Sequence, residues 1–429
     1  MKKITSLSCA MLLAGAIATP FPAAAMAADA PPPPKAESDA PVPAAKPVAT
    51  KPESVGVART DVVTITLEPD QSGPAAAASD PVNAEVVFVL DTTGSMGGLI
   101  EGAKQKIWSI ATDIQKTGGG KVKMGLIAYR DRGDQYVTKR TDLTDDLDTI
   151  YGILQSFKAD GGGDTPESVN QALNEAVTQF QWSDKPDTMK TIFLVGDCPP
   201  HMDYQDDVKY PESCKLAVGR HIVINTVQCG SQSSTVPIWR EIANLSAGDY
   251  AAIAQSGNMR VTTTPYDVRI AETSRKLDAT VIPYGSKAAQ KAVTSKLERA
   301  AAAAPASAAM RNAYKMSVAK EADVAFAVTG KGDLVQDASN PEVLKNLKPA
   351  ELPEKLQSAT PEDLKKIIAE KAAERSSLNQ ELAKLNTQRA DYLREEAKKN
   401  APVEDSFDAR VRKSIARQLQ NQREQATLK

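Results

Sequence analysis

The chain has 429 residues, of which 25% are charged and 5% aromatic, and its formal net charge is −2. This length exceeds that of one small domain and leaves ample sequence for a buried core. The balanced charge offers no basic surface of the kind that nucleic acids require, so we expect no nucleic-acid partner.

The first 27 residues have the pattern of an export signal. A positively charged start precedes an apolar stretch from Ile4 to Ala18, and Ala25-Met26-Ala27 is a small-x-small cleavage site. The apolar stretch is shorter than the roughly 20 residues that a membrane span needs. We therefore predict a signal peptide over residues 1–27 and a mature chain that does not span a membrane and is periplasmic or secreted.

Residues 28–83 are rich in proline and alanine and include Pro31-Pro32-Pro33-Pro34. Such a composition is typical of an extended spacer. One apolar run, Val62–Leu67, predicts a strand at the edge of the domain that follows.

Residues 84–285 alternate between short apolar runs and amphipathic segments of helical period. This order predicts an α/β domain with a doubly wound, mainly parallel sheet and surrounding helices. Strands are expected at residues 86–90, 122–129, 136–141, 191–195, 221–227 and 250–253, and helices at 96–116, 147–157, 165–180, 212–219, 238–245 and 267–277.

The remainder of the chain predicts an α-helical C-terminal region. Residues 286–359 read as mixed helix and linker, and Thr360-Pro361 is typical of a helix start for residues 360–429. This last segment predicts a long helix or a helical hairpin, with self-association through a weak coiled coil as one use of it. The apolar seam consists of Leu378, Leu382, Leu385 and Tyr392, and it is interrupted by Lys371, Arg375 and Arg389.

A turn rich in oxygen atoms follows the first strand of the α/β domain. Asp91, Thr93 and Ser95 lie two positions apart, directly after the run Val86–Leu90. Open α/β sheets bind ligands beyond the carboxyl ends of their strands. A carboxylate and two hydroxyls on a tight turn suit a small, hard cation such as Mg²⁺.

Two further segments carry oxygen ligands at the same predicted edge of the sheet. Thr165 follows the run Gly161-Gly162-Gly163, whose glycines allow the backbone to come close to a cation, and Asp197 follows the strand at 191–195. We therefore predict a metal site made of Asp91, Thr93, Ser95, Thr165 and Asp197. The cation expected is Mg²⁺, with Mn²⁺ and Ca²⁺ as alternatives.

The motif Asp-x-Thr-x-Ser resembles the first metal-site motif of von Willebrand factor type A (VWA) domains, usually Asp-x-Ser-x-Ser. The resemblance covers residues 84–277 and implies a metal-ion-dependent adhesion site. It implies that Thr93 and Ser95 bind the cation through their hydroxyls, and that Thr165 binds directly or through water. Asp91 and Asp197 would act through water and hydrogen bonds. An open coordination position would then accept an Asp or Glu side chain of a protein partner.

Two departures from the VWA pattern occur in this chain. Thr93 replaces the commoner serine and keeps the hydroxyl. Asp197 lies between Gly196 and Cys198, where many members have Thr-Asp-Gly. Apart from one in the export signal, the cysteines are Cys198, Cys214 and Cys229; a bridge between Cys198 and Cys229 and simple packing both remain open.

The sequence favours a non-enzymatic binding protein, an adhesion or scaffold module of the bacterial envelope, over two alternatives. Thr93-Gly94-Ser95-Met96-Gly97 approaches the Gly-x-Ser-x-Gly turn of serine hydrolases, with Asp197 and His201 or His221 as triad partners. The first glycine of that motif is missing. The other alternative is an envelope scaffold that acts through its C-terminal helices without a metal.

Overall fold

The computed structural model describes residues 81–163, 165–185, 187–318, 332–399 and 403–427. The predicted signal peptide, nearly all of the proline-rich spacer and the strand expected at Val62–Leu67 lie outside these residues. No helix among the residues described combines the length and the apolar character that crossing a membrane demands.

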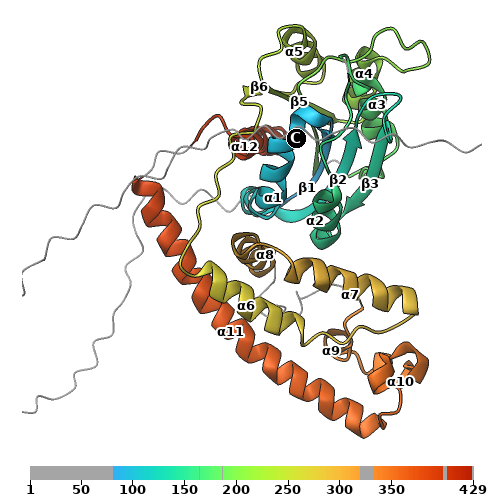
Figure 1. The fold of residues 1–429 in the computed structure, drawn as a ribbon, viewed down its shortest axis with the longest axis vertical. Helices are drawn as coiled ribbons and strands as arrows, with labels where there is room; N and C mark the ends of the chain where they lie inside the picture. Colours follow the sequence, from blue (N-terminus) through green and yellow to red (C-terminus); the bar gives the residue numbers. More distant parts are fainter. Residues whose placement is uncertain (1–80, 164, 186, 319–331, 400–402, 428–429) are drawn as a thin grey trace, which may run out of the picture. The chain divides into compact units, whose positions relative to one another are not determined.

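A six-stranded sheet in the order β3-β2-β1-β4-β5-β6 forms the centre of the α/β domain (Figure 1). Strand β1 pairs in parallel with β2 and β4, β5 pairs in parallel with β4 and β6, and only β3 runs antiparallel, against β2. The predicted mainly parallel sheet is therefore confirmed. The strands are β1 (Val82–Asp91), β2 (Gly119–Tyr129), β3 (Thr138–Thr144), β4 (Thr188–Gly196), β5 (Ile222–Cys229) and β6 (Tyr250–Ile253).

Helices cover both faces of this sheet because alternate residues of β1 point to opposite sides. Val86, Phe88 and Leu90 join one apolar core, whereas Val87 and Val89 join another. The first core is completed by α1 (Gly97–Gly118) and α2 (Leu147–Ser156), and the second by α3 (Val169–Thr178), α4 (Tyr210–Gly219) and α5 (Thr235–Leu245).

Several predicted boundaries differ from the observed ones by a few residues, and the third helix and β3 are two examples. The third helix begins at Val169 rather than at Thr165, because the backbone of Glu167 bonds to the loop that follows β4. Its N–H donates to Pro199 O at 3.0 Å, and its carbonyl accepts the N–H of His201 at 3.1 Å. Strand β3 occupies Thr138–Thr144 instead of residues 136–141, in register with β2.

The C-terminal region is helical and builds its own apolar clusters. Thr360 caps the long helix as predicted, since its Oγ1 accepts the N–H of Asp363 at 3.1 Å. The helices of this region are α6 (Asp267–Asp278), α7 (Lys287–Ala301), α8 (Pro305–Val318), α9 (Leu334–Asp337), α10 (Pro341–Asn346), α11 (Pro361–Lys399) and α12 (Phe407–Thr427). The sequence analysis placed α6 in the α/β domain, but this helix packs on α8 and α11 and so belongs to the helical region.

The two last helices have different neighbours. Helix α11 packs on α6, α8 and α9, and the arginines that interrupt its apolar seam form buried ion pairs there. Arg389 pairs with Asp267 at 2.8 Å, and Arg375 pairs with Asp333 at 2.8 Å. Helix α12 instead contacts α1 and β4, so the end of the chain contributes to the first core of the sheet.

Candidate metal centre

Asp91 anchors the candidate site at the carboxyl end of the central strand. Its carboxylate is fully buried, and its Oδ1 accepts the backbone N–H of Thr93 at 2.8 Å and the Thr93 hydroxyl at 2.6 Å. Thr93 Oγ1 lies 3.4 Å from Ser95 Oγ. The strand end and the short helix η1 (Gly94–Met96) therefore hold the three predicted motif residues together.

Asp197 lies next to this turn. It directly follows β4, the parallel neighbour of β1, and the Nε2 of Gln255 donates to Asp197 Oδ2 at 2.8 Å and to Ser95 O at 3.2 Å. Gln255 belongs to the loop after β6, so three segments of the chain meet here. The sequence analysis did not assign Gln255 to the site, because a single glutamine in a loop does not form a recognisable motif.

Thr165 reaches the same edge by a different contact. Its Oγ1 lies 3.6 Å from Cys198 Sγ, the residue after Asp197. In the part of the chain that the structure describes, no hydrogen bond joins Thr165 to the other four predicted ligands. Thr165 and Ser95 are both exposed, whereas Asp91 and Thr93 are buried. The hydroxyls thus form the accessible side of the site, above a buried carboxylate.

Glycines allow this close packing at two positions. Gly162 has a φ of +70°, and a Cβ there would lie 2.5 Å from the Cβ of Thr93. A Cβ on Gly196 would lie 2.3 Å from the Tyr129 hydroxyl. Any side chain at Gly162 would therefore push against the motif turn, and one at Gly196 would collide beneath it.

Glu167 is a further acidic residue at the site that sequence reasoning missed. It is 1% exposed, and its Oε1 is one of the atoms that a Cβ on Gly162 would meet. Glu167 stands in the run Thr165-Pro166-Glu167, which the sequence analysis interpreted as the start of a helix. An acidic residue in the first turn of a helix is common, so Glu167 was not assigned to the site. Because α3 begins only at Val169, Glu167 turns inward instead.

The electrostatics of the site favour a bound cation. Burial and the nearby charge of Asp197 raise the pKa of Asp91 to about 7, although the Thr93 hydrogen bonds oppose the rise. Burial and the charges of Asp91, Asp131, Asp134 and Asp197 raise the pKa of Glu167 to about 9. Asp91 Oδ2, Glu167 Oε2 and Asp197 Oδ1 are buried and have no hydrogen-bond partner. Unpaired buried carboxylate oxygens are costly unless a cation or a proton neutralises them.

The donor set fits Mg²⁺. It combines a few carboxylates with hydroxyls and an opening to solvent, whereas metals that prefer nitrogen and sulfur would need histidines or thiolates. Within the described ranges, no group of three or more His, Cys, Asp or Glu residues is arranged to hold a metal. Any cation here must consequently rely on hydroxyl oxygens, as the predicted set does.

The hydrolase alternative lacks its base in this geometry. His201 points its ring nitrogens at Asp203, 2.7 Å away, and at Asp131, 3.3 Å away. His221 precedes β5 and so lies at the opposite end of the parallel strands from Ser95. Among the hydrogen bonds of the described residues, none links Ser95 to a histidine. A triad needs a base within hydrogen-bond reach of its nucleophile.

The three cysteines of the α/β domain are buried and free. Of the two readings left open by the sequence, packing is the one confirmed, and the bridge between Cys198 and Cys229 is not formed.

Comparisons with known proteins give partial matches to this chain. Residues 85–264 match a family model described as von Willebrand factor A domain. A stretch of 120 residues is 28% identical to an ariadne-like RING finger protein of Acanthamoeba polyphaga mimivirus; the match covers 27% of this chain and spans only 11% of that relative.

Two solved structures also match parts of this chain. The crystal structure of the SpRpn10 VWA domain is 14% identical, with a TM-score of 0.33 and coverage of 42% of this chain and 91% of that one. Proximal thread matrix protein 1 from the mussel byssus is 16% identical, with a TM-score of 0.30 and coverage of 41% and 42%. The family match shows that residues 85–264 are similar to von Willebrand factor A domains, which are generally protein-interaction modules.

Proposed function

We propose that this chain, which carries a VWA domain, is a metal-dependent protein-binding module of the bacterial envelope. The observation that carries the proposal is the set of three buried, unpaired carboxylate oxygens of Asp91, Glu167 and Asp197, which lie next to the exposed hydroxyls of Ser95 and Thr165. That arrangement places buried carboxyl groups below an accessible rim of neutral oxygens, and the raised pKa values of Asp91 and Glu167 reflect the absence of a positive charge to balance them. It therefore suits a cation that binds on the buried side of the site and keeps a coordination position open on the exposed side.

Each residue has a distinct task in the proposed site. Thr93, fixed by its two bonds to Asp91, would offer its hydroxyl beside that of Ser95. Asp197, whose carboxylate is oriented by Gln255, and the buried Glu167 would balance the positive charge of the cation. Thr165 would complete the exposed rim. A bound Mg²⁺ supplies an electrophilic centre, and because neutral hydroxyls leave its charge incompletely balanced, it attracts an acidic side chain of a partner.

The rest of the chain fits an exported adhesion or scaffold protein. The predicted signal peptide would direct it to the periplasm or to secretion, and the proline-rich spacer would separate the domain from its start. The helices after residue 286 would then position the domain or join it to a second copy or another partner.

Titration calorimetry with MgCl₂ on the full mature chain tests the metal site. Wild type should take up one cation, and Asp91→Asn should lose this uptake, because the substitution removes the buried charge beneath the hydroxyls. Asp142→Asn is the matched control, since this carboxylate is exposed on β3 and, among the described residues, forms an ion pair with Arg140 alone. Uptake by Asp91→Asn equal to that of wild type would contradict the assignment.

A pull-down from envelope extract with and without EDTA tests the function. A protein that is captured by wild type and by Asp142→Asn, and is lost with EDTA or with Asp91→Asn, is the expected partner. Replacing its acidic contact residue by the corresponding amide should abolish binding by the purified proteins. A partner retained in EDTA would favour the metal-independent scaffold instead.

A further inference from the structure

Gln255 joins two of the segments that make up the proposed metal site. Its side-chain amide has two N–H hydrogens, and its Nε2 lies 3.2 Å from Ser95 O and 2.8 Å from Asp197 Oδ2. Ser95 belongs to the turn after β1, whereas Asp197 directly follows β4. One amide group therefore fixes the spacing between the motif turn and the carboxylate that comes from the neighbouring strand.

The bond to Gln255 also determines which oxygen of Asp197 is left for a ligand. Asp197 Oδ2 accepts the amide N–H, while Asp197 Oδ1 is buried and has no hydrogen-bond partner. Asp91 Oδ2 is likewise buried and unpaired, and it lies 3.1 Å from the position that a Cβ on Gly196, the residue before Asp197, would take. With Oδ2 engaged by Gln255, Oδ1 is the oxygen of Asp197 that remains for a cation.

The loop that carries Gln255 is held from three directions. A Cβ on Gly230, in the loop after β5, would lie 2.2 Å from Gln255 Oε1. A Cβ on Gly98 of α1 would lie 3.0 Å from the Cα of the next loop residue. The N–H of Phe407, the first residue of α12, donates to Gly257 O at 2.9 Å. The amide of Gln255 is thus a rigid support for Asp197 and not a side chain on a loose loop.

We propose that Gln255 determines the cation preference of the site and makes it select Mg²⁺ over Ca²⁺. This inference rests on the proposed metal-binding function and deepens it. Mg²⁺ requires oxygen ligands at about 2.0–2.1 Å in near-ideal octahedral geometry, whereas Ca²⁺ accepts about 2.3–2.6 Å and a flexible geometry. An Asp197 held at a fixed distance from Ser95 suits the smaller and more demanding ion. An Asp197 released from Gln255 would move outward and admit the larger ion.

Calorimetric titrations of the full mature chain with MgCl₂ and with CaCl₂ test the inference. Gln255→Met keeps the length of the side chain and removes both N–H donors, so the affinity for Mg²⁺ should fall about tenfold. The affinity for Ca²⁺ should fall by less than about threefold, because a looser site still satisfies the larger ion. The ratio of the two affinities should therefore fall at least about threefold.

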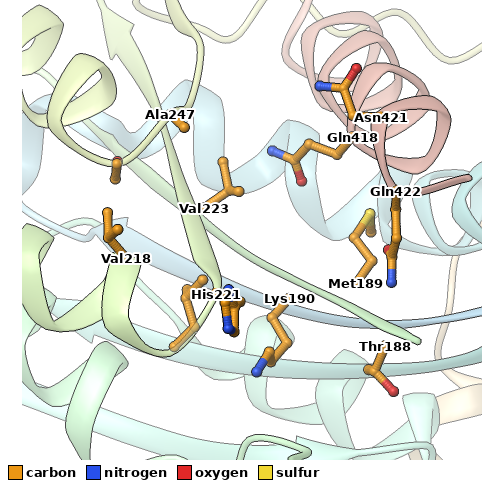
Figure 2. Close-up of a pocket in the computed structure, with 12 residues that line it drawn as sticks. Thr188, Met189, Lys190, Val218, His221, Val223, Ala247, Gln418, Asn421 and Gln422 are labelled. Carbon is orange, nitrogen blue, oxygen red and sulfur yellow. The ribbon is translucent and has the colours of Figure 1, made fainter. Parts of the chain in front are cut away.

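Two other glutamines provide matched controls. Gln232 is exposed in the loop after β5, at the same edge of the sheet as the proposed metal site. Gln422 of α12 lines a pocket at the amino ends of β4 and β5, at the opposite edge (Figure 2). Gln232→Met and Gln422→Met should both keep the wild-type affinities for the two ions.

Two measurements in EDTA separate positioning from a folding defect. The melting temperature of Gln255→Met should equal that of wild type, because the other contacts of the loop remain. Hydrogen exchange should become faster in residues 92–97 and 197–198, because the motif turn and Asp197 have lost their common support. A wild-type affinity ratio or a lowered melting temperature in Gln255→Met would overturn the inference and leave the metal site standing. A wild-type chain that takes up neither ion would overturn both.

Discussion

Replacing Asp148 by asparagine should weaken the attachment of helix α8 to the sheet domain. Asp148 belongs to α2 and is 7% exposed. Its carboxylate accepts the Nε of Arg311 at 2.7 Å and the Nη2 at 3.1 Å, and it accepts the ammonium of Lys315 at 2.8 Å. Both cations come from α8, so one buried carboxylate holds two charges from the helical region.

The size and the pH dependence of this effect follow from the burial of the ion pairs. Asp148→Asn would remove the carboxylate that Arg311 and Lys315 share, while Asp278 stays 3.6 Å from Arg311; breaking a buried ion pair typically costs about 3–5 kcal/mol, and the remaining partner places the expected loss near the lower end. Burial by itself would raise the pKa of Asp148, but the charges of Arg311 and Lys315 outweigh it and hold the pKa well below its usual value. The carboxylate therefore stabilises the fold above its unfolded pKa of about 3.9, and this contribution falls as the pH drops below that value.

Urea unfolding followed by tryptophan fluorescence measures the effect. Trp108 is a local reporter, because its ring centroid lies 5.6 Å from that of Tyr151 in α2 and 5.7 Å from that of Tyr314 in α8. Asp148→Asn should lower the free energy of unfolding at pH 7 by the amount above, whereas the exposed Asp142→Asn should not. The difference from wild type should shrink below about pH 4, by up to roughly 1.4 kcal/mol per pH unit. A loss under about 0.5 kcal/mol at pH 7, or a difference that stays constant in acid, would refute the reasoning.

Two other predictions concern packing at α12 and at the metal site. Leu419 is a fully buried residue of α12, so Leu419→Ala should lower the free energy of unfolding by about 2–5 kcal/mol. Leu216 is exposed, so Leu216→Ala should change it by under about 0.5 kcal/mol. Equal effects of the two substitutions would show that α12 is not part of the core. Gly162→Ala should abolish Mg²⁺ uptake in calorimetry, because the added Cβ would displace Thr93. Gly163→Ala should bind Mg²⁺ normally, because its Cβ would meet nothing within 4 Å. Retained uptake by Gly162→Ala would argue against the tight turn.

The sheet and the motif turn could be predicted because their signals are local. A short apolar run such as Val86–Leu90 can be buried on both faces only in a covered parallel sheet, and the oxygen-bearing residues after it, from Asp91 to Ser95, follow at fixed spacing. The parallel order of β1 and β4 then brings Asp197 to the same edge. Each of these steps needs only neighbouring residues and one rule of topology.

The inward turn of Glu167 could not be predicted in the same way. A proline followed by a glutamate is a common helix start, and local propensity gives no reason to reject it. The segment is extended instead because its backbone bonds to Pro199 and His201, more than thirty residues further along the chain. Such a contact decides which way the carboxylate points, and no window of the sequence contains both partners.

The packing partner of α12 also could not be predicted from the local sequence. Its apolar residues repeat with a helical period, which predicts a helix with one buried face but not the surface that the face covers. In the structure the ring centroid of Phe407 lies 6.1 Å from that of Phe88, which in turn stacks on Phe193 at 5.5 Å. Residues from the two ends of the described chain therefore share one core, and the stability of the sheet depends on a helix far outside the matched family segment. A change in the packing of α12 should consequently also affect the strands that carry the proposed metal site.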